Sequence, residues 1–110
     1  EERNEYFEYN KIHRVTEKLK EETQNKFGKE FGLVCSIGGQ ISFDIVPVGW
    51  DKSYCLQFVE KEFSNIFFFG DKIYEGGNDY EIAIDKRVTQ YFKTENPQCT
   101  LTILNELLPK

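Results

Sequence analysis

The spacing of apolar and polar positions changes several times along the chain, and each change predicts a different element. Residues 2–29 carry apolar side chains at near-helical intervals among many charged ones, which predicts an amphipathic helical region. Gly28 is suited to end it, and Asn10 is suited to cap a second helical segment that starts at Lys11. The apolar stripe consists of Ile12, Val15, Leu19 and Phe27.

Residues 33–47 change to strand-like patterns. An apolar run over 33–37 is followed by Gly38-Gly39, and then apolar and polar positions alternate over 41–47, which predicts a strand with one apolar and one polar face. The polar row is Gln40, Ser42 and Asp44. Such a row could bind sugar hydroxyls, but it is also typical of the wetted face of an antiparallel sheet, and the alternation leaves both interpretations open.

The rest of the chain alternates between helix and strand. Pro47 to Trp50 form a break, and Asp51 is suited to cap a helix that buries Tyr54, Cys55, Phe58 and Val59. Further elements are predicted as a strand over 65–69 buried on both faces, a short helix over 80–84, a strand over 88–92, and a helix from Asn96-Pro97 with Leu101, Leu104, Leu107 and Leu108 on its apolar side.

The loop after the apolar strand is the strongest candidate for chemistry. Asp71 follows the strand at its carboxyl end, where open α/β sheets bind ligands. Asp71 and Asp79 together suit a hard cation such as Mg²⁺. The alternative is an ordinary strand, polar loop and helix cap. Lys52 lies in a first helical turn, where a cation is mildly unfavourable unless an anion lies nearby.

Composition limits the classes of protein and partner. The chain has 110 residues, 39% hydrophobic and 30% charged, which is typical of one soluble globular domain. A net charge of −5 argues against nucleic acid as the main partner. No apolar run is long enough to span a membrane, and no signal-like segment opens the chain, so we expect a cytoplasmic protein. Three unpaired, buried, reduced cysteines are expected at 35, 55 and 99.

Three sequence blocks carry a specific resemblance. They are Ser36-Ile37-Gly38-Gly39-Gln40-Ile41-Ser42-Phe43-Asp44, Gly49-Trp50-Asp51-Lys52-Ser53-Tyr54-Cys55-Leu56, and Phe68-Phe69-Gly70-Asp71-Lys72 with Gly76-Gly77-Asn78-Asp79. In this order the whole chain resembles the C-terminal part of eukaryotic phosphomannomutases, which belong to the haloacid dehalogenase superfamily. The resemblance implies an α/β fold. Residues 1–49 would form the second half of an α/β cap, a helix plus antiparallel strands, and residues 50–110 the last βα units of a doubly wound hydrolase core.

The resemblance also implies an activity. The family interconverts mannose 6-phosphate and mannose 1-phosphate through a phospho-aspartate enzyme with Mg²⁺, for GDP-mannose synthesis, and is dimeric. Its nucleophile lies in an Asp-x-Asp segment that this sequence lacks, so we expect a C-terminal fragment that is inactive alone. Two alternatives remain. One is a sugar phosphatase of the same superfamily, and the other is a non-catalytic module that binds a divalent cation or phosphosugar.

The matching motif positions imply a role for each candidate residue. Lys52 would hold the charge of the transferring phosphoryl group, and Asp79 would orient the lysine, a water or the loop. Asp71 would bind Mg²⁺. The residues implied in sugar binding are Ser42, Asp44 and Gln40.

A second cation site is implied after the following helix. Ala83, through its main-chain carbonyl, and Asp85 fall at its ligand positions. Val88 stands where the family usually has threonine, and a valine side chain offers no oxygen to a cation. This departure puts the second site in doubt.

Overall fold

The N-terminal region is a helical arm with one break. The computed structural model describes residues 1–110, and the arm comprises α1 (Glu2–His13), α2 (Val15–Thr23), a π-helical turn (Gln24–Gly28) and α3 (Lys29–Phe31). The break lies at Arg14, which adopts the left-handed conformation with φ 51°, so the predicted start of the second segment at Lys11 is wrong. Asn10 still stabilises the start of the second helix, because its side-chain oxygen accepts a hydrogen bond from the Thr16 amide at 2.8 Å.

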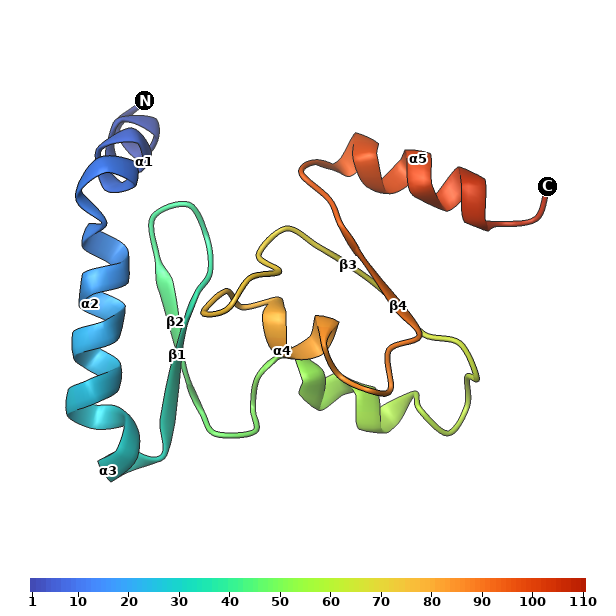
Figure 1. Cartoon of the computed structure of the whole chain (residues 1–110), viewed down its shortest axis with the longest axis horizontal. Helices are drawn as coiled ribbons and strands as arrows, with labels where there is room; N and C mark the ends of the chain where they lie inside the picture. The colour runs from blue at the N-terminus through green and yellow to red at the C-terminus, as the bar shows by residue number, and fades with distance from the viewer.

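A β-hairpin lies along this arm (Figure 1). β1 (Leu33–Ile37) pairs antiparallel with β2 (Phe43–Pro47), as predicted. Gln24 ties the arm to the hairpin, since its amide donates to the Leu33 carbonyl at 3.0 Å and accepts the Cys35 amide at 2.7 Å. The predicted second strand is too long at its start. Gln40 and Ser42 lie in the connecting turn, so only Asp44 of the expected polar row is on a strand.

The second half contains a parallel strand pair. β3 (Phe67–Gly70) pairs with β4 (Gln90–Lys93), and the chain between them includes α4 (Tyr80–Ala83). A 3₁₀-helix (Lys52–Phe58) precedes β3, and α5 (Pro97–Leu107) follows β4. The predicted start of α5 is confirmed, because the Asn96 side chain accepts the Cys99 amide at 2.8 Å. The helix–strand–helix–strand–helix order is the expected one.

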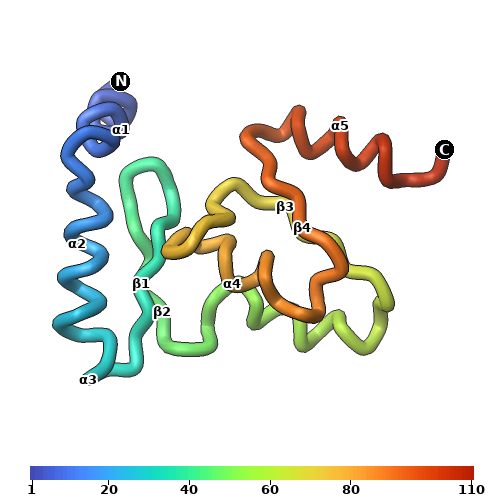
Figure 2. The backbone as a smooth tube through the Cα atoms, in the orientation of Figure 1, coloured from blue at the N-terminus to red at the C-terminus, as the bar shows by residue number.

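One strand end joins the hairpin to the second half. The Ile37 amide donates to the Gly76 carbonyl at 2.7 Å, and the Ile37 carbonyl accepts the Asn78 amide at 2.8 Å. The tube in Figure 2 shows the loop after β3 reaching the hairpin at this point. The contact places residues of both halves side by side. The division of the chain into 1–49 and 50–110 stays a prediction.

Several side chains predicted to be buried are exposed. Only 10 of the 110 residues are buried, and the 3₁₀-helix buries Leu56 instead of the expected stripe: Cys55 is exposed, Phe58 is 64% exposed, and Tyr54 stacks on the exposed Trp50. On β3, which was predicted to be covered on both faces, Phe67 is 46% exposed. The reason is that each sheet has only two strands, which are too few to build a covered core.

The extended shape agrees with this open packing. The radius of gyration is 16.2 Å, whereas a compact domain of this length has about 13 Å. α5 extends away from the strand pair in Figure 1. Its residue Leu101 and Leu108, the residue that follows the helix, are more than half exposed. Of the three free cysteines, only Cys35 is buried as predicted, while Cys99 is partly exposed. No helix has both the length and the apolar character needed to cross a bilayer.

Candidate functional site

A buried carboxylate is the centre of the candidate site. Asp79 is 3% exposed, and its Oδ1 accepts a hydrogen bond from Lys52 Nζ at 2.6 Å. Its Oδ2 accepts the main-chain amides of Asp71 at 3.1 Å and Lys72 at 3.0 Å. Both carboxylate oxygens are therefore occupied. Asp79 fixes the lysine and the start of the loop after β3 relative to each other.

The charge state of Asp79 follows from these contacts. Burial raises the pKa of its carboxyl, but the hydrogen bond from Lys52, the amide of Lys72, the lysine charge and the amide of Asp71 together outweigh burial. The net pKa of Asp79 lies below its usual value. Asp79 is therefore an anion at neutral pH, and Lys52 faces a fixed negative charge.

The glycines around this carboxylate are sterically required. A Cβ at Gly70 would lie 2.7 Å from Asp79 Oδ2, and a Cβ at Gly77 would lie 2.2 Å from the Lys72 carbonyl oxygen. Gly76, the residue before Gly77, has φ +93°. The Gly-Asp and Gly-Gly-Asn-Asp patterns thus let the loop fold tightly enough to present two amides to Asp79.

The main chain of Lys52 is fixed by the helix cap, whereas its side chain is half exposed. Asp51 caps the 3₁₀-helix, as predicted, by accepting the Ser53 amide at 2.8 Å and the Ser53 hydroxyl. This cap fixes the main chain that carries Lys52. The Lys52 side chain is 49% exposed, so its ammonium group can contact Asp79 and a second anion at once.

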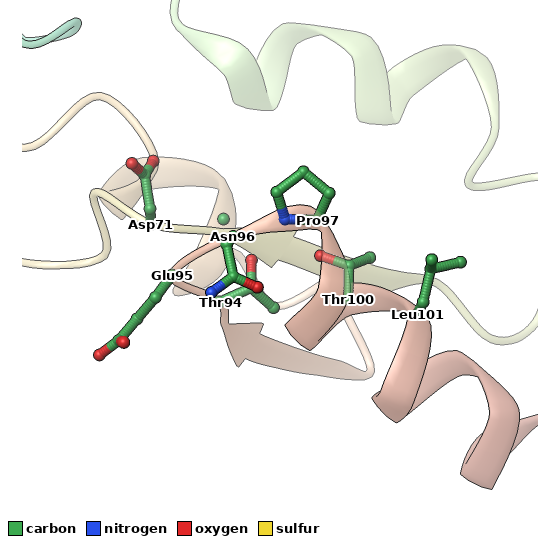
Figure 3. A pocket seen from close by; sticks show the side chains of 8 residues that line it. Asp71, Thr94, Glu95, Asn96, Pro97, Thr100 and Leu101 are labelled. Atoms are coloured by element: carbon green, nitrogen blue, oxygen red, sulfur yellow. The ribbon is translucent and has the colours of Figure 1, made fainter.

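Asp71 lies at the edge of a cavity of about 650 Å³ at the carboxyl ends of the two parallel strands (Figure 3). Its side chain is 59% exposed, and its nearest charged partner is Lys72 Nζ at 3.7 Å. Glu95 also lines the cavity, but Figure 3 shows its carboxylate directed away from that of Asp71. The remaining lining residues are Gly70, Thr94, Asn96, Pro97, Thr100 and Leu101.

These positions fit a partial magnesium site. No group of three or more His, Cys, Asp or Glu side chains converges anywhere in the chain. Asp71 offers free carboxylate oxygens, whereas those of Asp79 are taken by Lys52 and two amides. Mg²⁺ typically uses one or two protein carboxylates and completes its shell with water and substrate phosphate. One free acid is compatible with that pattern but does not complete it.

Of the three residues predicted to bind sugar, only Asp44 lies beside Lys52. Asp44 Oδ2 accepts the Asn78 side-chain amide at 3.1 Å, and Asp44 and Lys52 line one small cavity of about 90 Å³. Ser42 is exposed in the turn, and Gln40 donates to the Asn4 side chain at 3.1 Å. The sequence pattern does not predict the contact from Asn78, although this residue belongs to the Gly-Gly-Asn-Asp block.

The residues predicted for a second cation lie at the end of α4 and just after it. Ala83 is 4% exposed at the end of α4. Asp85 is bound by Arg87, which donates from its main-chain amide, Nε and Nη2, each at 2.9 Å. The hydrogen bond from the Arg87 side chain is the main reason that the pKa of Asp85 falls to about 2. This arginine was missed as a partner, and its position two residues after an aspartate was the available signal.

The structure and these contacts define a class of protein, an α/β protein with a polar site at the carboxyl ends of parallel strands. Comparison with known proteins identifies the family. Residues 1–110 match the profile of a protein family described as "Eukaryotic phosphomannomutase". The chain belongs to this family.

Curated relatives match most or all of the chain. It is 49% identical to "Phosphomannomutase 2" of Dictyostelium discoideum over 111 residues, covering 100% of this chain and 44% of the relative. It is 52% identical to "Phosphomannomutase" of Saccharomyces cerevisiae, covering 97% of this chain and 42% of the relative. A phosphomannomutase of Arabidopsis thaliana is 56% identical over 82 residues. The chain thus spans less than half the length of these relatives.

Proposed function

We propose that this chain is part of a phosphomannomutase that interconverts mannose 6-phosphate and mannose 1-phosphate. The family match over residues 1–110 and relatives bearing that name support the proposal. Transfer would pass through a phosphorylated aspartate supplied by sequence outside these 110 residues, and the product would serve GDP-mannose synthesis. Its partners would be phosphorylated hexoses and a second copy of the full-length protein.

One observation carries the assignment of roles within the chain, the Lys52–Asp79 pair anchored on the loop that bears Asp71. A lysine held by a buried carboxylate is a fixed cation that needs little reorganisation when phosphoryl charge develops beside it. Asp79 acts through Lys52 and the loop, as a positioning residue. Lys52 itself would contact the phosphoryl group.

Asp71 would supply one carboxylate to Mg²⁺. When bound, this ion would neutralise charge on the phosphate oxygens. The free oxygens of Asp71 and its place at the end of β3 support this role. At the second predicted cation site, Asp85 would have to exchange its three contacts with Arg87 for the ion, which makes this site the weaker of the two.

Asp44 would contact the sugar from the hairpin side, with Ser42 and Gln40 from the adjoining turn. The small cavity shared by Asp44 and Lys52 supports such a placement, because a ligand there would meet both halves of the chain. A sugar contact of this kind favours a mutase over a simple phosphatase, since a mutase must re-present the same sugar to the enzyme.

The test is a coupled assay on the full-length protein and on the 110-residue chain, with mannose 1-phosphate as substrate. We expect turnover by the full-length protein and none by the chain alone. Release of inorganic phosphate without isomerisation would identify a phosphatase instead. Turnover by the chain alone would contradict the requirement for an aspartate outside it.

A further inference from the structure

A second pocket, distinct from the lysine–aspartate pair, has an excess of positive charge. Its volume is about 290 Å³, and it lies where the helical arm breaks, against the turn after β1 and the loop after β3. Three cations line it, Lys11, Arg14 and Lys72, with one acid, Glu17. Among the lining residues cations thus outnumber acids by two, although Lys11 is paired at 3.1 Å with Glu8 outside the lining, which leaves Arg14 and Lys72 as the cations of interest.

The cations are not fully neutralised by their neighbours. Arg14 Nε donates to Glu17 at 3.1 Å, but the two terminal nitrogens of its guanidinium group make no hydrogen bond within the chain. Lys72 Nζ lies 3.7 Å from Asp71 Oδ2, too far for a good hydrogen bond. Lys72 is also the most enclosed of the paired lysines, with 26% of its side chain exposed. Donors therefore remain available on two walls of the pocket.

Neutral donors complete the lining. Gln40 and Tyr74 also line the pocket, and the Gln40 amide group keeps one N–H beyond the one that it donates to the Asn4 side chain. Burial, together with the nearby charges of Glu17, Asp71 and Asp79, raises the pKa of the Tyr74 hydroxyl, so it stays protonated at neutral pH. A tyrosine hydroxyl and a glutamine amide can both donate to an oxyanion.

We propose that this pocket binds the phosphate group of a small phosphorylated metabolite, held by Arg14 from the helical arm and Lys72 from the loop. A concave site with several cations concentrates small anions, and a guanidinium fork suits the geometry of phosphate oxygens. The acidic charge of the whole chain disfavours an extended polyanion, and the pocket volume suits a small ligand. Such a ligand would bridge the two halves of the chain.

Arg14 and Lys72 have no role in the proposed function, and Gln40 is the one lining residue also assigned to the sugar, so variants of Arg14 and Lys72 test the pocket independently of the proposed function. The probe is inorganic phosphate, titrated into the 110-residue chain at constant ionic strength while amide resonances are followed by NMR. We expect saturable shifts at the amides of Thr16, Gly39 and Gln40, around the pocket. Arg14→Gln and Lys72→Gln should each weaken phosphate binding about tenfold, the loss of one charge-assisted hydrogen bond.

Matched variants decide whether the effect is local. Lys18→Gln removes the same charge from an exposed position on the helical arm outside the pocket and should leave phosphate affinity within about twofold. Lys52→Gln should also leave it unchanged, whereas Glu17→Gln should strengthen it by removing the one acid in the lining. Circular dichroism checks that each variant is folded.

Three results would overturn the proposal. The first is an absence of saturation at the pocket amides, and the second is equal weakening by Lys18→Gln and Lys72→Gln. The third is loss of these shifts in Lys52→Gln, which would assign phosphate to the lysine–aspartate pair.

Discussion

Lys52 Nζ lies 2.6 Å from Asp79 Oδ1, and the two residues differ sharply in exposure: the lysine side chain is 49% exposed, whereas the aspartate side chain is 4% exposed. The lysine keeps access to water and ligand, while its partner is sealed into the fold by two main-chain amides. The positive charge of Lys52 is thus accessible to solvent, whereas the negative charge of Asp79 is buried and held in one place. The two carboxylates of the loop differ in the same way, since the Asp79 side chain is buried and the Asp71 side chain is 59% exposed.

The first prediction concerns stability. Asp79→Asn should lower the free energy of unfolding by about 1–2 kcal/mol, because a charge-assisted hydrogen bond is lost and two amides face a weaker acceptor. The half-exposed lysine can be solvated after the change, which limits the loss. Urea unfolding of the 110-residue chain measures it. Asp71→Asn is the matched control and should change stability by less than about 0.5 kcal/mol, because that side chain is exposed. Equal effects would contradict the distinction.

The second prediction concerns acid. The folded pKa values of Asp79 and Asp85 are both lowered, that of Asp85 to about 2. Their stabilising contributions are thus fully present above the unfolded pKa, about 4, and are lost as pH falls through the folded values. Urea midpoints should therefore drop between pH 5 and pH 2. Asp85→Asn and Asp79→Asn should each make this pH dependence shallower. If both variants keep the pH dependence of the urea midpoint seen in the unmodified chain, the prediction is wrong.

The third prediction tests the tight loop. Gly77→Ala should destabilise the chain by roughly 2 kcal/mol or more, because its methyl group would meet the Lys72 main-chain carbonyl at 2.2 Å, which a side-chain movement cannot relieve. At Gly39 the nearest atom to a new Cβ is the Ser42 hydroxyl oxygen at 3.2 Å, so Gly39→Ala is the control and should be much milder. Thermal or urea unfolding compares the two. If Gly39→Ala proves the more damaging, the loop geometry described here is wrong.

The fourth prediction concerns the metal. In a full-length enzyme carrying this chain, Asp71→Asn should lower kcat/KM roughly a hundredfold or more and raise the Mg²⁺ concentration needed for half-maximal activity. Glu95→Gln, from the same cavity but with a carboxylate directed elsewhere, should have little effect on either. Activity titrated against Mg²⁺ measures both quantities. Near-normal activity of Asp71→Asn at limiting Mg²⁺ would refute the ligand role.

The fifth prediction separates sugar handling from phosphoryl transfer. Asp44→Ala in the full-length enzyme should raise KM for mannose 1-phosphate about tenfold while phosphoryl-enzyme formation changes less, since Asp44 belongs to the hairpin and contacts Asn78. Single-turnover phosphorylation and steady-state assays distinguish the steps. Equal loss in both would count against a sugar contact.

Local sequence signals predicted the order of elements well. The Asn96 cap, the Asp51 cap and the parallel pairing of β3 with β4 depend on short-range chemistry or on strong patterns, and all three are present. The helix break was misplaced because the N-cap of the second helix is Arg14, and Asn10 instead accepts the Thr16 amide from six residues away, a geometry that simple capping rules do not include.

Burial was predicted poorly, for a physical reason. Apolar patterning at Tyr54, Phe58 and Phe67 reports that a side chain favours a covered environment, but it does not report whether a covering layer exists within the same 110 residues. Likewise, a row of alternating polar positions did not reveal that the turn extends to Ser42. Among the site residues, Lys52 and Asp79 are paired by a tertiary contact across 27 residues. The spacing of residues along the sequence alone does not predict such a contact.

The contact at Ile37 has a mechanical consequence. This residue makes two main-chain hydrogen bonds to the loop, one through its amide and one through its carbonyl, while the chain between the halves turns at Gly49, with φ +87°. The hairpin cannot swing away gradually while both bonds hold. Separation of the hairpin from the loop therefore requires both bonds to break, and the hydrogen-exchange rate of the Ile37 amide would report how often they do.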